Sequence, residues 1–481
     1  MPLGFTIRRS AYFDSVALMR VAERARQLTG VIDVALVMGT AANRTMLTDA
    51  GLLPADAPPT AAADLVAVVS AQTGDAVDAA LARVSELLSA RPDATVASQE
   101  ITPRTLVSAA RTATAASVAV VAVPGPYAAL EAHQALSAGL HVFLFSDGVT
   151  LEDEIALKRR ARARGRFVMG PECGTAIIRG VGFGFSNRVR RGAVGVVGAS
   201  GTGMQEVTTL IHRLGAGVSH AIGTGARDLH AAVGGITTLQ ALERLGADDD
   251  TKVIVIVSKP SSPDVADGVL TAAAATHKPV VACLLGYEGT MPAGVRAAPT
   301  LEDAASVAVT LAHGGGQAPA LRVDQSNSVG GSVGEIRGLY SGGTLCEEAR
   351  RLVAGTVHRF VDFGAEEYTR GRPHPIIDPG RRHAAILDAA TEGGVGVVLL
   401  DVVLGDGAHP DPAGAMAPVL IEAQERARRG GRALSVVAHV VGTDQDVQDL
   451  ARQEATLRQH GAIVCASNRA AALTARGVAG A

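Results

Sequence analysis

The sequence predicts an α/β protein with several doubly wound parallel-sheet domains, Rossmann-like and flavodoxin-like, and a small α+β unit at the N-terminus. Short runs of Val, Ile and Leu alternate with longer stretches rich in Ala, Arg and Glu. Aliphatic runs of about four to eight residues are typical of strands buried on both faces of a parallel sheet, and the intervening stretches are long enough for helices. The 481 residues exceed one ordinary core, so we expect about three or four units.

The first 98 residues are predicted to form the small α+β domain. Strands and a helix follow one another in β-α-β order, and a proline-rich loop at 54–59 interrupts them. The strands are expected at 5–9, 33–38 and 65–70, and the helix at 14–28.

Three larger domains are predicted after this unit. Residues 99–190 are expected to be Rossmann-like, residues 191–313 flavodoxin-like and residues 335–481 a second flavodoxin-like domain. The Gly- and Ser-rich segment 314–334 indicates a linker. Buried strands are expected at 118–123, 142–145, 194–197, 218–222, 253–257, 280–285, 397–403 and 434–441.

The composition argues against nucleic acid and membrane as partners. Lys and Arg number 44 against 47 Asp and Glu, the net charge is −3, and Trp is absent, so the chain has neither a basic field nor a stacking surface for bases. No charged leader with an apolar segment opens the chain, and no apolar run reaches the roughly 20 residues of a membrane helix. We therefore expect a soluble, cytoplasmic protein.

The four cysteines are scattered without paired spacing. This pattern argues against a disulfide framework or a metal site and fits a reducing cytosol. We expect no metal, and we expect Cys173, Cys283, Cys346 and Cys465 to be small apolar core residues.

A glycine-rich turn at 198–203 follows the aliphatic run 193–197 and precedes a predicted helix at 204–214. The unpaired amides and the positive dipole end of a helix start can hold a phosphate, and Ser200, Gly201, Thr202 and Gly203 supply small hydroxyl and glycine residues at that position. An ordinary tight βα turn is the alternative.

A second turn of this kind precedes the predicted helix 345–354. It contains Ser341, Gly342, Gly343 and Thr344, which can either bind phosphate or simply cap the helix. Together the two turns predict one anion that is held from both sides.

Four charged residues are further candidates for the site. Arg227 follows the strand at 218–222, with a surface pair to Asp228 as the alternative. Lys259 follows the strand at 253–257 and can meet an anion or remain a solvated loop lysine. Asp406 and His409 follow the strand at 397–403, where they can form an acid/base or cation site or an ordinary turn.

The densest positive stretch of the chain is 158–166, which follows an acidic segment at 152–154. This order of charges matches a helix macrodipole, so a solvated helix is expected there, with a partner-subunit contact as the alternative.

Several motifs carry a resemblance to known families. The stretches 123–127, 169–174 and 195–202 resemble successive landmarks of the succinyl-CoA synthetase α subunit. The stretches 198–203, 221–229, 338–346 and 400–405 resemble the FdrA family, and this likeness extends over almost the whole chain.

The resemblance to the synthetases implies that two helix starts face each other across a phosphohistidine. It places Ser200 to Gly203 on the α-type helix and Ser341 to Thr344 on the β-type helix, both within one polypeptide. It also gives residues 99–190 the character of a CoA-binding domain. Two departures stand out: the loop at 286–294 has no histidine, and the domain at 99–190 has no glycine-rich CoA loop.

The FdrA resemblance implies a subunit of an oxamate carbamoyltransferase, which phosphorolyses oxalurate, or a related ureido acid, to oxamate and carbamoyl phosphate. Its expected partners are phosphate, a small-molecule substrate and other subunits, in a homo- or hetero-oligomer. Phosphate is then a substrate, no cofactor is needed, and CoA is left open. Arg227, Ser200 and Thr202 are the expected catalytic residues. Gly201, Gly203, Ser341, Gly342, Gly343 and Thr344 are the expected phosphate-binding residues.

Two other functions remain open at this point. One is an NDP-forming acyl-CoA synthetase, an acid–thiol ligase that uses CoA and a nucleotide. The other is a non-catalytic scaffold or regulatory subunit whose N-terminal unit senses a metabolite, since no strong acid/base constellation is visible in the sequence.

Overall fold

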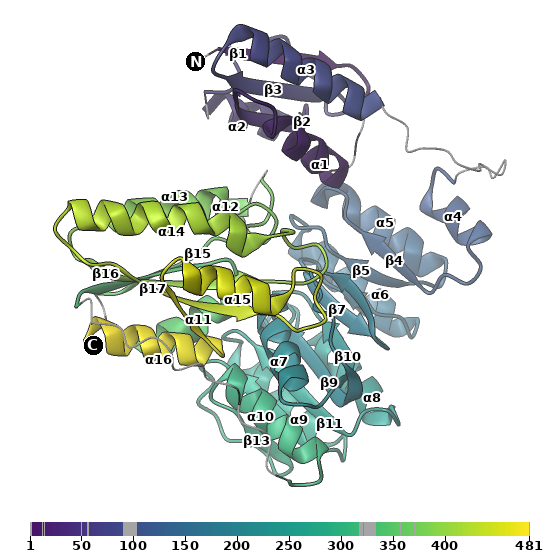
Figure 1. Ribbon diagram of the computed structural model, residues 1–481. Helices are drawn as coiled ribbons and strands as arrows, with labels where there is room; N and C mark the ends of the chain where they lie inside the picture. The colour runs from purple at the N-terminus through teal and green to yellow at the C-terminus, as the bar shows by residue number, and fades with distance from the viewer. Residues whose placement is uncertain are drawn as a thin grey trace. The chain divides into compact units, whose positions relative to one another are not determined.

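The computed structural model confirms an α/β protein with parallel sheets and a small N-terminal α+β unit (Figure 1). It describes residues 1–481 except 1, 12, 14, 50, 55–56, 90–102, 317–320, 322–332, 356, 370–371 and 481. Most of the predicted linker at 314–334 lies outside the described residues. The chain divides into two compact units, Met1–Thr102 with Arg370–Pro373, and Pro103–Thr369 with His374–Ala481. The finer domain boundaries stay a prediction.

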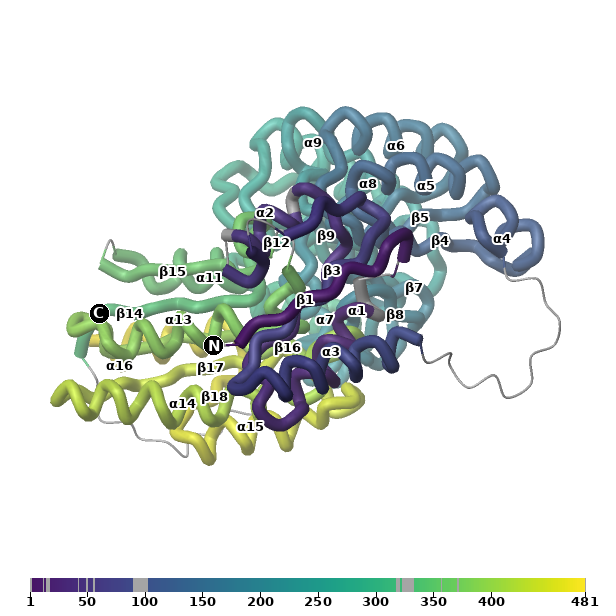
Figure 2. The backbone as a smooth tube through the Cα atoms, turned by 90° about the horizontal axis from the view of Figure 1, so that it is seen from above, coloured from purple at the N-terminus to yellow at the C-terminus, as the bar shows by residue number. Residues whose placement is uncertain are grey.

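The N-terminal unit contains a three-stranded antiparallel sheet in the order β1-β3-β2. The central strand β3 is buried along its whole length. Two helices, α1 and α3, cover one face through Leu18 and Val77, while α2 covers the other through Leu47. Figure 2 shows β1 beside β3. The elements are β1 (Leu3–Arg8), α1 (Ser15–Arg26), β2 (Val31–Met38), α2 (Ala41–Asp49), β3 (Leu65–Ala71) and α3 (Gly74–Ser89).

The second unit begins with a small parallel sheet in the order β4-β5-β6. Its core consists of Leu and Val from the strands and of alanines from α5, which allow close helix packing. The elements are α4 (Leu106–Thr112), β4 (Val118–Val121), α5 (Gly125–Ser137), β5 (His141–Leu144), α6 (Leu151–Ala163) and β6 (Val168–Met169).

A seven-stranded sheet follows in the order β13-β12-β11-β9-β10-β7-β8. Five strands are parallel, but β7 and β8 form an antiparallel hairpin at one edge. Arg179 and Gly180 connect them and both have positive φ, as a two-residue hairpin turn requires. The strands are β7 (Thr175–Ile178), β8 (Val181–Gly184), β9 (Arg191–Ala199), β10 (Val218–Gly223), β11 (Val253–Ser258), β12 (Val280–Leu284) and β13 (Val295–Ala297).

Helices cover both faces of this sheet. The first pair, α7 (Gly201–Arg213) and α10 (Leu301–Ala312), covers one face, and α8 (Ile236–Ala247) and α9 (Pro263–Ala274) cover the other. The β9–turn–α7 order therefore places the first glycine turn at the carboxyl edge of a parallel sheet, where ligands of such folds bind.

The last sheet is five-stranded and fully parallel, in the order β15-β14-β16-β17-β18. In Figure 1, α13 and α14 lie above it, and α11 and α16 lie below. The strands are β14 (Glu335–Tyr340), β15 (Arg359–Asp362), β16 (Val395–Val403), β17 (Ser435–Val441) and β18 (Ala462–Cys465). The helices are α11 (Gly343–Val353), α12 (Glu366–Thr369), α13 (Gly380–Thr391), α14 (Pro412–Arg429), α15 (Leu450–Gln459) and α16 (Asn468–Ala479).

One hydrophobic core joins the seven-stranded and five-stranded sheets. It includes Val207 of α7, Ala305 of α10, Leu345 of α11 and Ala475 of α16, and α7 contacts α11 directly. The packing of these helices holds the two sheets together and brings the N-terminal ends of α7 and α11 to one place.

A buried ion cluster joins the small parallel sheet to the seven-stranded one. The Lys158 ammonium on α6 donates to Glu154 Oε1 at 2.7 Å, to Asp228 Oδ1 at 2.7 Å and to the Thr224 carbonyl at 2.9 Å, and its side chain is fully buried. The expectation of a solvated helix at 158–166 is therefore wrong for Lys158, because two carboxylates compensate its charge inside the protein.

No helix in the described part of the chain is long and apolar enough to cross a bilayer.

Replacing Lys158 by Met should lower the free energy of unfolding by about 3–5 kcal/mol, because Asp228 would remain buried without its cation and Glu154 would keep only Arg227. Urea unfolding followed by circular dichroism measures this loss. The matched control is Arg162→Met on the same helix, whose exposed pair with Glu243 should contribute less than about 1 kcal/mol. Equal effects of the two substitutions would contradict the assignment.

Candidate functional site

The N-terminus of α7 lies at the end of the buried strand β9. Ser200 is the N-cap, and its hydroxyl accepts a hydrogen bond from the Gly203 amide at 3.1 Å. This bond serves one of the first amides of the helix. The amides of Gly201 and Thr202 also belong to the first turn, which has no intrahelical acceptors, and both residues are half-buried.

The N-terminus of α11 is built differently. Its N-cap is Gly342, and no side chain caps the helix. Instead, Asp401 accepts hydrogen bonds from the Ser341 and Gly342 amides, both at 2.8 Å, and from the Ser341 hydroxyl at 3.0 Å. The Arg382 guanidinium in turn donates to Asp401 at 2.6 Å. Ser341 therefore does not cap the helix but is held by a buried carboxylate.

The two helix starts meet. Ser200 Oγ lies 2.7 Å from Thr344 Oγ1 in a buried hydrogen bond. A Cβ atom on Gly203 would come within 2.8 Å of Thr344 Cγ2, and one on Gly342 within 2.7 Å of Thr202 Oγ1. Glycine is therefore needed at both positions for this close approach. Each helix start has a partial charge of about +0.5, so their meeting creates a strong local demand for negative charge.

A lysine and an aspartate flank this meeting point. Lys259 Nζ lies 3.7 Å from Asp362 Oδ2, and both side chains approach Gly343, the first residue of α11, so closely that a side chain there would collide with them. Lys259 follows β11 and is 44% exposed, whereas Asp362 ends β15 and is 22% exposed. Burial raises the pKa of Asp362, and the Lys259 ammonium opposes that shift.

Asp362, Asp401 and Arg382 were not predicted as site residues from the sequence. The available signal was weak but present: Asp401 is the one charged residue in the otherwise apolar strand β16, which is buried along its length. A carboxylate in such a place requires donors, and the amides of the neighbouring glycine turn provide them.

The structure places the other candidates as follows. Lys259 lies beside Gly343 at the start of α11. The Arg227 guanidinium instead donates to Glu154 at 2.9 Å and to the Val149 carbonyl at 2.8 Å. Asp406 forms an exposed pair with Arg188 at 3.0 Å. His409 accepts from the Asp411 amide at 3.0 Å, which is the contact of an ordinary turn.

The alternative proposed for Arg227, a surface pair with Asp228, is also not what the structure has, since Asp228 bonds Lys158. None of the hydrogen bonds between described residues connects Arg227, Asp406 or His409 to Ser200 or Thr344. Catalytic and phosphate-binding roles for the predicted residues remain proposals.

A buried polar network fixes α7 and α11 behind their N-termini. Glu206 on α7 lies 2.7 Å from His439 Nε2, and its other oxygen accepts from the Asn468 amide at 3.0 Å. Glu348 on α11 accepts from the Leu301 amide and from the Asn468 side chain, both at 2.7 Å. The network therefore connects both helices to α10, α16 and β17.

Two groups of this network have shifted pKa values. Burial raises the pKa of Glu348 to about 7, against the opposing effect of the two N–H donors. Burial opposes protonation of His439, but the Glu206 carboxylate outweighs it and raises the pKa. Because both ring nitrogens of His439 face acceptors, Glu206 and the Cys465 carbonyl at 3.1 Å, the charged imidazolium fits this position.

No group of three or more His, Cys, Asp or Glu residues in the described parts of the chain is arranged to hold a metal. The buried Cys173 is not activated, since burial raises the pKa of its thiol to about 12.

Three family models match the chain. "AllF, heavy metal-associated domain" matches residues 1–103, "CoA binding domain" matches residues 189–286, and "CoA-ligase" matches residues 339–478. The CoA-binding match contains the whole of α7, and the CoA-ligase match contains the whole of α11. The two helix starts that meet thus belong to two different matched families.

YahF of Escherichia coli K12, an uncharacterized protein, is 38% identical over 511 aligned positions, which cover 99% of this chain and 98% of YahF. The chain belongs to the YahF family. It is FdrA-like, as the motifs predicted. A second relative of this YahF-family protein is the succinate–CoA ligase [ADP-forming] subunit alpha of Aquifex aeolicus VF5, with 28% identity over 192 residues, 38% of this chain and 60% of the subunit.

Among solved structures, the acetyl-coenzyme A synthetase 1 of Ca. Korarchaeum cryptofilum in its apo form aligns with 79% of this YahF-family chain and 87% of its own length. The identity is 14% and the TM-score 0.36.

These findings overturn the expected carbamoyltransferase activity. The family models over the two meeting segments are those of CoA-binding and CoA-ligase domains, which supports the alternative of an acid–thiol ligase. The prediction followed what the FdrA resemblance implied and left CoA open because residues 99–190 lack a glycine-rich CoA loop. The CoA-binding match lies at 189–286 instead, and CoA becomes a plausible ligand.

The heavy metal-associated family model implies a metal that the residues of this chain do not fit. Residues 1–103 contain neither Cys nor His, since the first His is His133 and the first Cys is Cys173. Soft thiolate and imidazole donors, which thiophilic metals prefer, are therefore missing from the matched segment.

Protonation of Glu348 should make stability pH-dependent. Its folded pKa of about 7 exceeds the ordinary 4.5, so its contribution is fully present below pH 4.5 and is lost as the pH rises to 7, a change on the order of 3 kcal/mol. In Glu348→Gln, urea midpoints measured from pH 5 to 7.5 should fall less steeply than in the wild type.

Glu347→Gln on the same helix is the control, since Glu347 pairs with Arg350 and Arg351 near the surface. An unchanged slope in Glu348→Gln would show that Glu348 is ionised throughout this range.

Proposed function

We propose that this YahF-family protein binds CoA and acts as an acid–thiol ligase of the NDP-forming acyl-CoA synthetase type, with a phosphoryl group held between the N-termini of α7 and α11. The observation that carries the proposal is the 2.7 Å contact between Ser200 and Thr344, which joins the start of a helix in the CoA-binding match to the start of a helix in the CoA-ligase match.

The donor set fits a phosphoryl group. The first-turn amides of Gly201, Thr202 and Gly343 stand at helix N-termini, where amides bind anions. Lys259 adds a full positive charge next to Gly343, where the Asp362 carboxylate also lies. Asp401 neutralises part of the charge at α11, so we propose that the anion takes the place of Asp362 as the partner of Lys259.

In the proposed reaction, the first-turn amides and Lys259 would contact the phosphate that leaves or attacks. Amides and an ammonium fixed in place stabilise negative charge that develops on phosphate oxygens, without reorganisation of solvent. Thr202 is half-buried beside the contact, and its hydroxyl can orient one phosphate oxygen. The loop at 286–294 has no histidine, so we infer that the phosphoryl group is held noncovalently between the two helix starts.

CoA, when bound, supplies the thiol that accepts the acyl group. We assign its binding to the carboxyl edge of β9, β10 and β11, because these strands lie in the matched CoA-binding segment and ligands of parallel sheets bind at this edge. The turn at 198–203 and the Ser258–Lys259 corner are the parts of this edge nearest to α11.

Calorimetric titration of the full-length protein with CoA tests the proposal, together with an assay for thioester formation from acetyl phosphate and CoA. We expect CoA to bind and acetyl-CoA to appear with release of phosphate. Binding without turnover would leave a CoA-binding scaffold and contradict the enzymatic part, and absence of CoA binding would contradict the whole.

Lys259→Met should weaken the binding of inorganic phosphate about tenfold, because one charge-assisted contact to the anion is lost. The matched control is Lys252→Met, at the opposite end of the same strand β11, which should leave phosphate affinity unchanged. The affinities are measured by titration followed by phosphorus NMR. An equal loss in both variants would indicate general electrostatics rather than a contact at the helix starts.

A further inference from the structure

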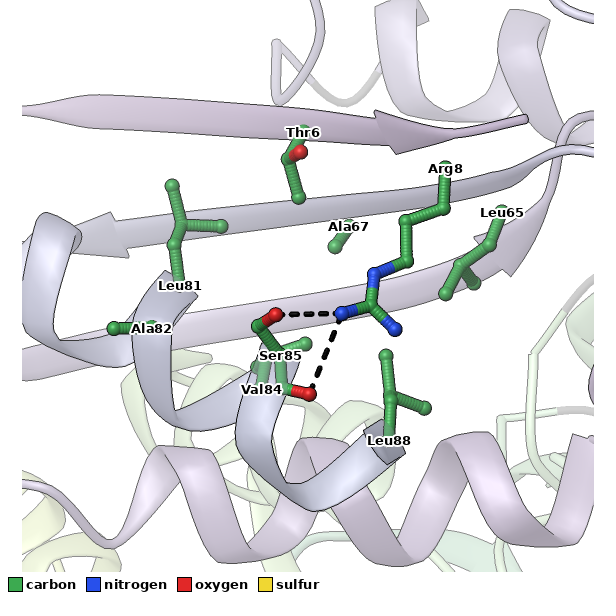
Figure 3. Close-up of a pocket in the computed structure, with 9 residues that line it drawn as sticks. All are labelled: Thr6, Arg8, Leu65, Ala67, Leu81, Ala82, Val84, Ser85 and Leu88. Atoms are coloured by element: carbon green, nitrogen blue, oxygen red, sulfur yellow. Dashed lines mark hydrogen bonds between the residues drawn. The ribbon is translucent and has the colours of Figure 1, made fainter. Parts of the chain in front are cut away.

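The N-terminal unit contains a cavity of about 320 Å³. Figure 3 shows it between β1, β3 and α3. Its walls are largely apolar, with polar atoms from Thr6, Arg8 and Ser85 on two sides. The apolar lining comes from Leu65, Ala67, Leu81, Ala82, Val84 and Leu88.

The cavity arises where α3 separates from β1. At Gly4 the helix is so close that a Cβ atom would collide with Val77 and come within 3.3 Å of Leu81. Two and four residues further along the strand, Thr6 and Arg8 project toward the same helix from the same face. The opening is therefore produced by the packing of the domain and not by a loop.

Arg8 carries a charge that no described residue of the domain neutralises. The Arg8 guanidinium bonds the helix through Nη2, which donates to the Ser85 hydroxyl at 2.5 Å, to the Ser85 carbonyl at 3.4 Å and to the Ser89 hydroxyl at 3.3 Å. Among the described residues no carboxylate pairs with Arg8, whereas the neighbouring Arg9 binds Asp64 at 2.8 Å. The guanidinium is thus fixed on one side and offers its other donors toward the cavity (Figure 3).

We propose that this cavity binds a small organic monocarboxylate with a short aliphatic body, and that it takes the place of a metal site in this domain. One guanidinium matches one carboxylate, which Nη1 can bind by a charge-assisted hydrogen bond while Nη2 stays on Ser85. The apolar walls match an aliphatic chain, and the volume lies at the lower end of the range for small-molecule sites. The lack of Cys and His in residues 1–103 removes the donors that a heavy metal needs.

This inference is independent of the proposed CoA chemistry, because every residue it uses lies within Met1–Thr102. Its failure would leave the function proposed for the helix starts untouched, and the converse also holds.

Saturation-transfer NMR on the full-length protein with isovalerate as probe tests the inference, with neutral isovaleramide as the isosteric comparison. We expect isovalerate to bind and isovaleramide to bind at least tenfold more weakly. Arg8→Gln should weaken isovalerate at least tenfold. Ala82→Leu, an exposed position at the wall, should also reduce binding by filling the cavity. The matched control is Arg83→Gln, whose exposed pair with Glu86 lies outside the lining residues, and it should bind as the wild type does.

Three results would overturn the inference. They are isovalerate affinity unchanged in both Arg8→Gln and Ala82→Leu, equal binding of acid and amide, or no detectable binding of isovalerate. A further arm incubates the protein with zinc or copper(I), followed by dialysis and elemental analysis. If the wild type and Arg8→Gln both retain one equivalent of the metal, the domain has a metal site. That result would contradict the inference that the carboxylate site takes its place. Circular dichroism of each variant verifies folding.

Discussion

The meeting of two helix N-termini is the constraint on which the rest of this structure depends. Two positive dipole ends repel each other, yet Ser200 and Thr344 are in hydrogen-bond contact. The glycines at 203 and 342 remove the side chains that would keep the helices apart. Asp401 brings negative charge to one start. The fold therefore holds an unfavourable electrostatic arrangement, which is why we propose a phosphoryl group as its ligand.

The packing of α7 and α11 against the rest of the protein must hold the two helix starts in contact. The helices α7 and α11 share one hydrophobic core with α10 and α16, and the buried network of Glu206, His439, Glu348 and Asn468 fixes their relative position. A buried charge network is costly unless every member is satisfied. Here the network connects the two sheets at the point where a small displacement would separate the helix starts. Holding the helix starts together is therefore the structural role that accounts for burying these polar groups.

The fold and the position of the site were largely predictable from the sequence. Aliphatic runs such as that at 253–257 gave strand β11, and the glycine turns after β9 and β14 gave the two helix starts, because both signals are local. Partners that depend on tertiary structure were not predictable. Arg227 was expected at the anion edge, but the loop after β10 turns it toward Glu154 on α6. Lys158 was expected in solvent, but Asp228, 70 residues away in sequence, holds it inside.

The functional prediction was likewise correct in one part and wrong in another. The motifs pointed to the correct families, but carbamoyl transfer was taken from what the FdrA resemblance implied, and CoA was left open because residues 99–190 lack a glycine-rich loop. An absent residue does not determine which reaction a site performs. The matches over residues 189–286 and 339–478 correct the choice, because they cover the very helices that meet.

A crystal structure of the protein grown with inorganic phosphate would show whether the two helix starts hold an anion. We expect one phosphate beside the Ser200–Thr344 contact, within hydrogen-bond distance of first-turn amides from both α7 and α11 and of Lys259. Helix starts that are separated, or a phosphate bound elsewhere while this position stays vacant at saturating concentration, would contradict this expectation.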